Sequence, residues 1–165
     1  MTKLTYKKAS IAVAVLLISS SFTNAVHAAD EHNVVPGLTA VGKPLGLHGI
    51  DPVAFINIGN RISGSASFTE TYDNVAYYFS SEDNKNAFKK NPSKYVPQNG
   101  GFCTFGVSVG KKFDGNPKFA AVKNGKLYVF LNEDIFRLFQ KDQDGTIVKA
   151  SQQWQKIEHA AALSL

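Results

Sequence analysis

The single cysteine of the chain, Cys103, offers the richest chemistry in the sequence. Residues 97–106 read PQNGGFCTFG, so two adjacent glycines precede the thiol and aromatic rings flank it. Glycines permit positive φ angles and close backbone approach, which suits a functional loop. Free cysteine is also among the residue types most often buried. Two interpretations are therefore open: Cys103 is a reactive or metal-binding thiol, or it is a small core residue.

His48 and Asp51 are the polar residues that we expect beside Cys103 if the fold brings the two segments together. Thiolate and imidazole ligands suit Cu(I), so Cys103, His48 and Asp51 are the candidate ligands of a metal ion such as copper. The same pair is the minimum for a cysteine nucleophile, because a neighbouring cationic histidine lowers a thiol pKa. Alternatively, His48 is a surface or capping residue, and Asp51 starts a turn before Pro52.

A cysteine–histidine enzyme is the weaker hypothesis. The sequence shows no third group to orient the histidine and no second glycine-rich elbow for an oxyanion hole. It also has no phosphate-binding loop and no dinucleotide fingerprint. We therefore expect a binding module and not an enzyme, and we assign no catalytic residue.

Aromatic residues make up 12% of the chain and supply a second binding hypothesis. Ligand pockets are mostly apolar, with a few placed polar groups. The alternative function is a small-molecule carrier whose pocket is lined by Tyr77, Phe102, Phe105 and Tyr128. In the opposing interpretation the same rings fill the core, since each buries roughly 150–250 Å². A protein-interaction domain is a third hypothesis, for which no particular surface patch or partner stands out.

Two β-hairpins are expected to position these residues. Asp73-Asn74 tolerates the left-handed turn conformation, and Asn124-Gly125 between alternating apolar runs is the strongest short-range hairpin signal. The predicted strands cover residues 67–72, 75–79, 118–123 and 126–131.

Three helices are expected from capping residues and apolar spacing. The first covers residues 82–90, with Ser80 or Ser81 as its cap, and the second follows Asn132. The third opens at Asp144-Gly145 and continues to about residue 157. No internal repeat is evident. The sequence thus predicts a single α+β domain, a small antiparallel sheet built from two hairpins with about three helices packed on it.

The N-terminus has the pattern of an export signal. Lys3, Lys7 and Lys8 precede an apolar run over residues 11–18, and Val26-His27-Ala28 resembles a cleavage site, so we expect cleavage after Ala28. The apolar run is shorter than the ~20 residues that a bilayer span needs. The predicted organisation is a signal peptide (1–28), a flexible lead-in (29–46) and a domain (47–160). The expected location is periplasmic or secreted, with no membrane span after cleavage.

Charge and cysteine content narrow the function classes. The formal charge of +5 includes three lysines and no acid in residues 1–28, so the remainder carries +2. Such a nearly balanced domain gives nucleic-acid binding no support. One cysteine cannot form a disulfide within the chain, so stability must come from packing.

Several passages together resemble the YHS domain family, in its stand-alone exported type. They span roughly residues 47–155 and occur in this order: Gly49-Ile50-Asp51-Pro52-Val53-Ala54-Phe55, Tyr77-Tyr78-Phe79-Ser80-Ser81, Phe88 with Asn91-Pro92-Ser93-Lys94-Tyr95, Gly100-Gly101-Phe102-Cys103 and Gly125-Lys126-Leu127-Tyr128.

The resemblance implies a domain type that occurs in heavy-metal transport ATPases and in some monooxygenase components. Its metal-associated relatives carry cysteines where this chain has Ala54, Ser80 and Asn84. Soft-metal sites need thiolate or imidazole donors, so the family's cysteine cluster is absent here. The resemblance thus implies the stand-alone subgroup without settling its biochemical role.

Overall fold

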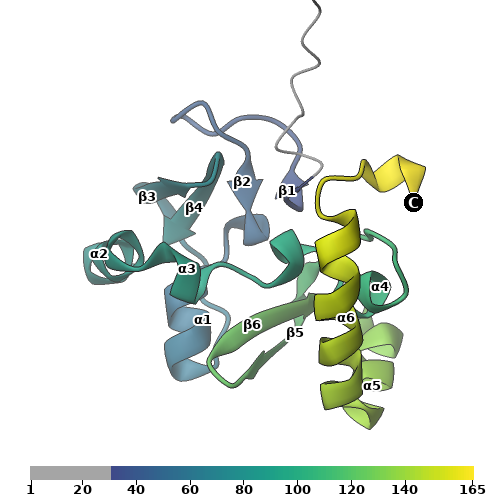
Figure 1. The fold of residues 1–165 in the computed structure, drawn as a ribbon. Helices are drawn as coiled ribbons and strands as arrows, with labels where there is room; N and C mark the ends of the chain where they lie inside the picture. The colour runs from purple at the N-terminus through teal and green to yellow at the C-terminus, as the bar shows by residue number, and fades with distance from the viewer. Residues whose placement is uncertain (1–30) are drawn as a thin grey trace, which may run out of the picture.

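The computed structural model describes residues 31–165 (Figure 1). The predicted signal peptide and its cleavage point after Ala28 lie outside these residues. Within 31–165, no helix has the length and apolar character needed to cross a membrane. The elements are β1 (Val34–Val35), β2 (Leu45–Gly46), the 3-10 turn η2 (Leu47–Gly49), α1 (Pro52–Ile58), β3 (Ser65–Tyr72), β4 (Val75–Phe79), α2 (Glu82–Lys90), α3 (Pro92–Tyr95), the 3-10 turn η3 (Asn99–Gly101), α4 (Thr104–Ser108), β5 (Asn116–Lys123), β6 (Lys126–Phe130), α5 (Glu133–Lys141), α6 (Gln143–Ile157) and the 3-10 turn η4 (Ala162–Ser164).

Both predicted hairpins are confirmed, but they do not share one sheet. β3 pairs antiparallel with β4, and β5 pairs antiparallel with β6, around turns whose residues have positive φ angles. The first hairpin belongs to a four-stranded mixed sheet of order β1-β2-β4-β3, whereas β5 and β6 form a sheet of two strands. The α+β class is therefore right, and the single antiparallel sheet is wrong.

Part of the predicted flexible lead-in is ordered sheet. β1 pairs antiparallel with β2, and β2 pairs in parallel with β4 through Leu45 and Ala76. The backbone N–H of Asn33 also donates to the carbonyl of Gly100 at 2.8 Å. Glycine and proline in this segment shape its turns, and the sheet begins before residue 47.

The three predicted helices are present as α2, α5 and α6. α6 starts at Gln143, one residue earlier than expected. Asp142 is its N-cap, and the side chain of Asp142 accepts from the N–H of Gly145 at 2.9 Å. The short helices α1, α3 and α4 were not predicted. With four to seven residues each, they are too short to show apolar periodicity.

The chain contains an internal duplication that sequence inspection missed. β3 and β5 both start and end 51 positions apart (116 − 65 and 123 − 72), and the same shift relates β4 to β6 and α2 to α5. The register irregularity recurs at the same place, between Ser65 and Thr69 and between Asn116 and Ala120. Each copy is a β-hairpin followed by a nine-residue helix.

The duplication extends upstream of the hairpins. η2 and η3 start 52 positions apart, and each holds three consecutive residues with positive φ angles, Leu47-His48-Gly49 and Asn99-Gly100-Gly101. Each is followed by a short helix, α1 or α4. The second copy is therefore one residue shorter between its 3-10 turn and its hairpin. Most other side chains differ between the copies, which explains why the repeat is not obvious in the sequence.

Equivalent rings build the cores of the two copies. Phe79 packs on Phe88 with ring centroids 5.0 Å apart, and their counterparts Phe130 and Phe139 lie 4.3 Å apart. All four side chains are fully buried. A third cluster of Leu47, Phe55, Leu127 and Val129 joins the copies.

The capping residues of α1 and α4 occupy equivalent positions but differ in chemistry. Asp51 is fully buried, and its Oδ1 accepts from the N–H groups of Val53 and Ala54 at 2.8 and 3.0 Å. Its Oδ2 accepts from the N–H and hydroxyl of Ser80 and from the side-chain amide of Asn84, at 2.7–2.8 Å. Asp51 thus fastens α1 to the end of β4 and to α2.

In the second copy Cys103 replaces Asp51. The positions of Ser80 and Asn84 are taken by Leu131 and Ile135, which pack in the same apolar cluster as the thiol. The Sγ of Cys103 accepts from the N–H of Gly106 at 3.5 Å. The residues around this cap are thus polar in the first copy and apolar in the second, and in each copy they suit the capping residue that they surround.

We expect the change Asp51→Ala to lower the free energy of unfolding by about 3 kcal/mol or more, since several buried donors lose their acceptor at once. Urea unfolding measures this difference. Ser81→Ala is the matched control, because it removes only the cap of α2 and should cost about 1 kcal/mol. Equal losses in the two variants would show that Asp51 is an ordinary cap.

Candidate functional site

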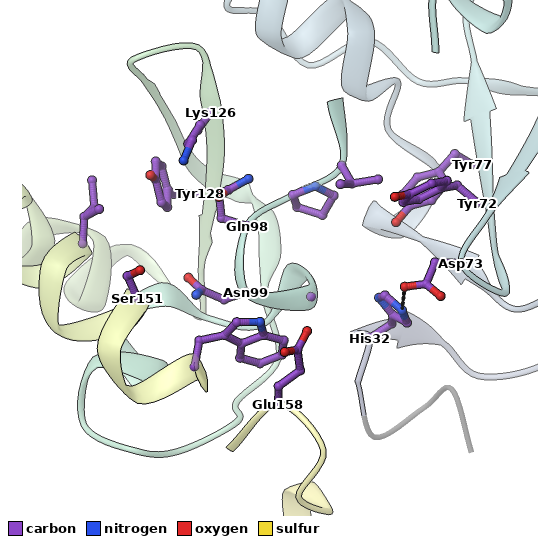
Figure 2. A pocket seen from close by; sticks show the side chains of 15 residues that line it. His32, Tyr72, Asp73, Tyr77, Gln98, Asn99, Lys126, Tyr128, Ser151 and Glu158 are labelled. Carbon is purple, nitrogen blue, oxygen red and sulfur yellow. Dashed lines mark hydrogen bonds and ion pairs between the residues drawn. The ribbon is translucent and has the colours of Figure 1, made fainter. Parts of the chain in front are cut away.

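A groove of about 320 Å³ lies between the two copies of the repeat (Figure 2). The first copy, with the segment before it, lines one side, and β6 and α6 line the other. The segment that connects the copies forms part of the wall. The lining residues are His32, Tyr72, Asp73, Tyr77, Val96, Pro97, Gln98, Asn99, Gly100, Lys126, Tyr128, Ile147, Ser151, Trp154 and Glu158.

Tyr77 and Tyr128 are equivalent residues of the two copies, and both line this groove. Their side chains are nearly buried, with 4% and 7% exposure. Figure 2 shows the hydroxyls of Tyr72 and Tyr77 directed toward the space between the two sides. Burial raises the pKa of both Tyr77 and Tyr128, and the charge of Asp73 raises that of Tyr77 further. Both phenols therefore stay protonated at neutral pH and can donate hydrogen bonds.

Charged groups stand at separate places around the groove. The Nε2 of His32 lies 3.1 Å from Oδ2 of Asp73 on the side of the first copy. Lys126 and Glu158 belong to the other side, where Figure 2 shows them well apart. Neither Lys126 nor the Glu158 carboxylate forms an ion pair within the described part of the chain. A cation and an anion are thus available to a ligand.

The part of the wall formed by the connecting segment is held in place by backbone contacts. The N–H of Gln98 donates to the carbonyl of Leu127 at 2.8 Å, which ties the connecting segment to β6. Asn99 has a left-handed φ of 55°, a conformation that asparagine tolerates. Its Oδ1 is buried without a hydrogen-bond partner in the described structure, which leaves a polar atom unsatisfied at the groove.

Trp154 forms part of the wall on α6. Its ring packs on Phe102 with centroids 6.2 Å apart, and the ammonium of Lys112 lies 5.3 Å from the centroid of each ring. The same ammonium donates to the carbonyls of Glu158 and Ala160. The indole is therefore fixed before any ligand arrives, which lowers the entropic cost of binding.

Cys103 does not line this groove. Its side chain is 1% exposed, and it packs with Tyr128, Phe130 and Phe139. It borders a separate apolar cavity of about 120 Å³, together with Phe105 and Leu131. Burial raises the pKa of the thiol. This environment disfavours the thiolate, which is the form that binds metals and attacks substrates.

The three predicted metal ligands are not assembled into one site. His48 is one-third exposed, and its Nε2 lies 3.4 Å from Oδ1 of Asp114. Asp51 directs both carboxylate oxygens to α1, Ser80 and Asn84. Residues 31–165 contain no group of three or more His, Cys, Asp or Glu side chains that could hold a metal ion.

The four rings predicted to line a pocket are divided. Tyr77 and Tyr128 line the groove, whereas Phe102 lies behind Trp154 in the core and Phe105 lines the small cavity beside Cys103. Sequence reasoning missed Lys126, His32 and Trp154 as groove residues. The 51-residue shift between Tyr77 and Tyr128 was the signal that could have linked the two sides.

No protein family, curated protein or solved structure matches this chain. The resemblance to the YHS family therefore stays a prediction.

We expect Cys103 to react with Ellman's reagent at least ~100-fold more slowly in the native protein than in concentrated guanidinium chloride, because its sulfur is buried and its pKa is raised. Absorbance of the nitrothiobenzoate that the reagent releases measures both rates. Because the pKa is raised, the native rate should still climb as pH increases above 9. Comparable rates in the two states would show an accessible thiol and would revive the metal hypothesis.

Proposed function

We propose that this protein is a binding module for a small polar organic molecule, held in the groove between the two copies of the repeat. The observation that carries the proposal is the convergence of Tyr77 and Tyr128 on one groove from equivalent positions of the duplicated hairpins. The alternative of a small-molecule carrier thus has more geometric support than the copper site.

The groove has the size and composition of a ligand site. Its volume of about 320 Å³ falls at the lower end of the ~300–1,000 Å³ typical of ligand pockets. Rings of Tyr72, Tyr128 and Trp154 provide apolar surface, and Gln98 offers a side-chain amide that can both donate and accept. Such a mixture favours a molecule with a flat or apolar body and several hydrogen-bonding groups.

Binding is favoured over catalysis by the arrangement of reactive groups. The only thiol of the chain lies outside the groove, and the imidazole of His32 is held by Asp73. The proposed setting is outside the cytoplasm, as the N-terminal export pattern predicts. A stand-alone YHS-type module would fit such a role.

Trp154 provides a direct test, since it is the sole tryptophan and lines the groove. A panel of amino acids, sugars, nucleosides and aromatic acids is added to the purified protein. We expect at least one compound to change the tryptophan fluorescence in a saturable manner and to raise the thermal midpoint, because a ligand of the folded state stabilises it by mass action.

The variants Lys126→Ala and Tyr128→Phe should each lower the affinity for that compound about tenfold, since each removes a hydrogen-bonding group from the groove. Tyr78→Phe is the matched control, because Tyr78 neighbours Tyr77 on β4 and lies outside the groove lining. Binding that is unchanged in Lys126→Ala and Tyr128→Phe would contradict the assignment of the groove. A panel without any fluorescence or thermal response would contradict the binding role.

A further inference from the structure

A second depression, of about 350 Å³, shares no residue with the groove. It is lined by His48, Ile50, Asn60, Arg61, Asn116, Pro117 and Lys118. Three of these side chains are basic and none is acidic. Arg61 and Lys118 form no ion pair with any described residue, and the Nε2 of His48 lies 3.4 Å from Oδ1 of Asp114. The depression therefore brings together two cations, Arg61 and Lys118, that no described carboxylate pairs with.

The duplication shows what a cation does at this position. Arg61 is equivalent to Lys112 of the second copy under the 51-residue shift, and Ile50 is equivalent to Phe102 under the 52-residue shift that relates η2 to η3. Lys112 is buried, and its ammonium donates to the carbonyl oxygens of Glu158 and Ala160 at 2.8 and 2.7 Å. In the second copy, acceptor oxygens thus fill the place beside the cation. In the first copy, Arg61 instead lines the open depression.

His48 adds an independent observation. Its φ of 50° lies in the left-handed region, which is unfavourable for a residue with a side chain. The equivalent residue of the second copy is Gly100, which adopts the same conformation without strain. No other residue fits at position 100, because a Cβ there would lie 2.0 Å from the carbonyl oxygen of Glu31.

Core packing does not explain the strain at His48. The neighbouring Leu47 also has a positive φ, but its side chain is buried among Phe55, Leu127 and Val129. The side chain of His48 is one-third exposed and lies beside Asp114, away from this cluster. Strained residues that the core does not need are concentrated at functional sites. The imidazole of His48 instead lines the basic depression.

We propose that the depression of His48, Arg61 and Lys118 is a second ligand site, and that it binds a small oxyanion, either a carboxylate or a phosphate group. Arg61 supplies the planar donor fork that suits both anions, and Lys118 supplies a mobile point charge. The amides of Asn60 and Asn116 add neutral donors. This site shares no residue with the groove, so anion binding here does not depend on the function proposed above.

The test is a titration of the full-length protein, followed by amide chemical shifts, with sodium phosphate, acetate and glycerol phosphate at constant ionic strength. We expect saturable shifts at the amides of His48, Arg61, Asn116 and Lys118. A phosphomonoester that binds more tightly than inorganic phosphate would assign the site to a larger phosphorylated molecule, and tightest binding of acetate would assign it to carboxylates. Absence of saturable shifts for all three anions would overturn the proposal.

Variants separate a built site from general surface charge. Arg61→Gln and Lys118→Gln should each weaken binding about tenfold, since each removes a charged donor. Lys111→Gln is the control, because it removes one exposed charge from the position equivalent to Asn60, outside the depression. Equal affinities in all three variants would overturn the site.

His48→Gly gives a second readout that a purely structural role would not produce. It should raise the thermal midpoint, because the backbone strain is relieved, and at the same time weaken anion binding. His48→Ala, which keeps the strain and loses the imidazole, should weaken binding without raising the midpoint. A His48→Gly protein that is more stable and binds the anions as tightly as the wild type would remove His48 from the site.

Discussion

The buried carboxylate of Asp51 is the interaction on which the first half of the structure depends. It is fully enclosed, yet donors from three directions saturate both of its oxygens. A buried carboxylate is costly unless it is hydrogen-bonded, so the surrounding segments must all hold their places. α1, the end of β4 and the first turn of α2 meet at this group. Ala54, Ser80 and Asn84, where the resemblance places the cysteines of metal-associated relatives, all contact it.

The second half solves the same structural problem without a charge. Cys103, Leu131 and Ile135 stand where Asp51, Ser80 and Asn84 stand in the first half, and they pack as an apolar group. The sulfur still caps its helix through Gly106. This explains why the only cysteine is buried: it is the apolar counterpart of a structural aspartate. The lone thiol therefore has a packing role that requires no metal and no substrate.

Sequence reasoning predicted the locally determined parts of the fold. Asp73-Asn74 and Asn124-Gly125 mark the hairpins because their turn conformations demand such residues, and Ser81 and Asn132 mark helix starts through capping. The strand order depends on long-range pairing, such as that of Leu45 with Ala76, which no local pattern encodes. The same limit applies to the site. Tyr77 and Tyr128 were picked for their chemistry, but their meeting with Trp154 depends on how the copies dock.

The equivalence of the two halves also bears on how the groove arose. Two matching units within one chain are the expected product of duplication and fusion of a single unit, whose two copies would at first have presented the same side chains. Once both copies are in one chain, a substitution in one copy no longer changes the other. Tyr77 and Tyr128 are still the same residue in both copies. In contrast, the residue equivalent to buried Val75 is the exposed Lys126, and the residue equivalent to Asp73 is Asn124. Unlike walls can hold an asymmetric molecule in a single orientation, whereas two identical walls facing each other across a twofold axis would offer two equivalent orientations.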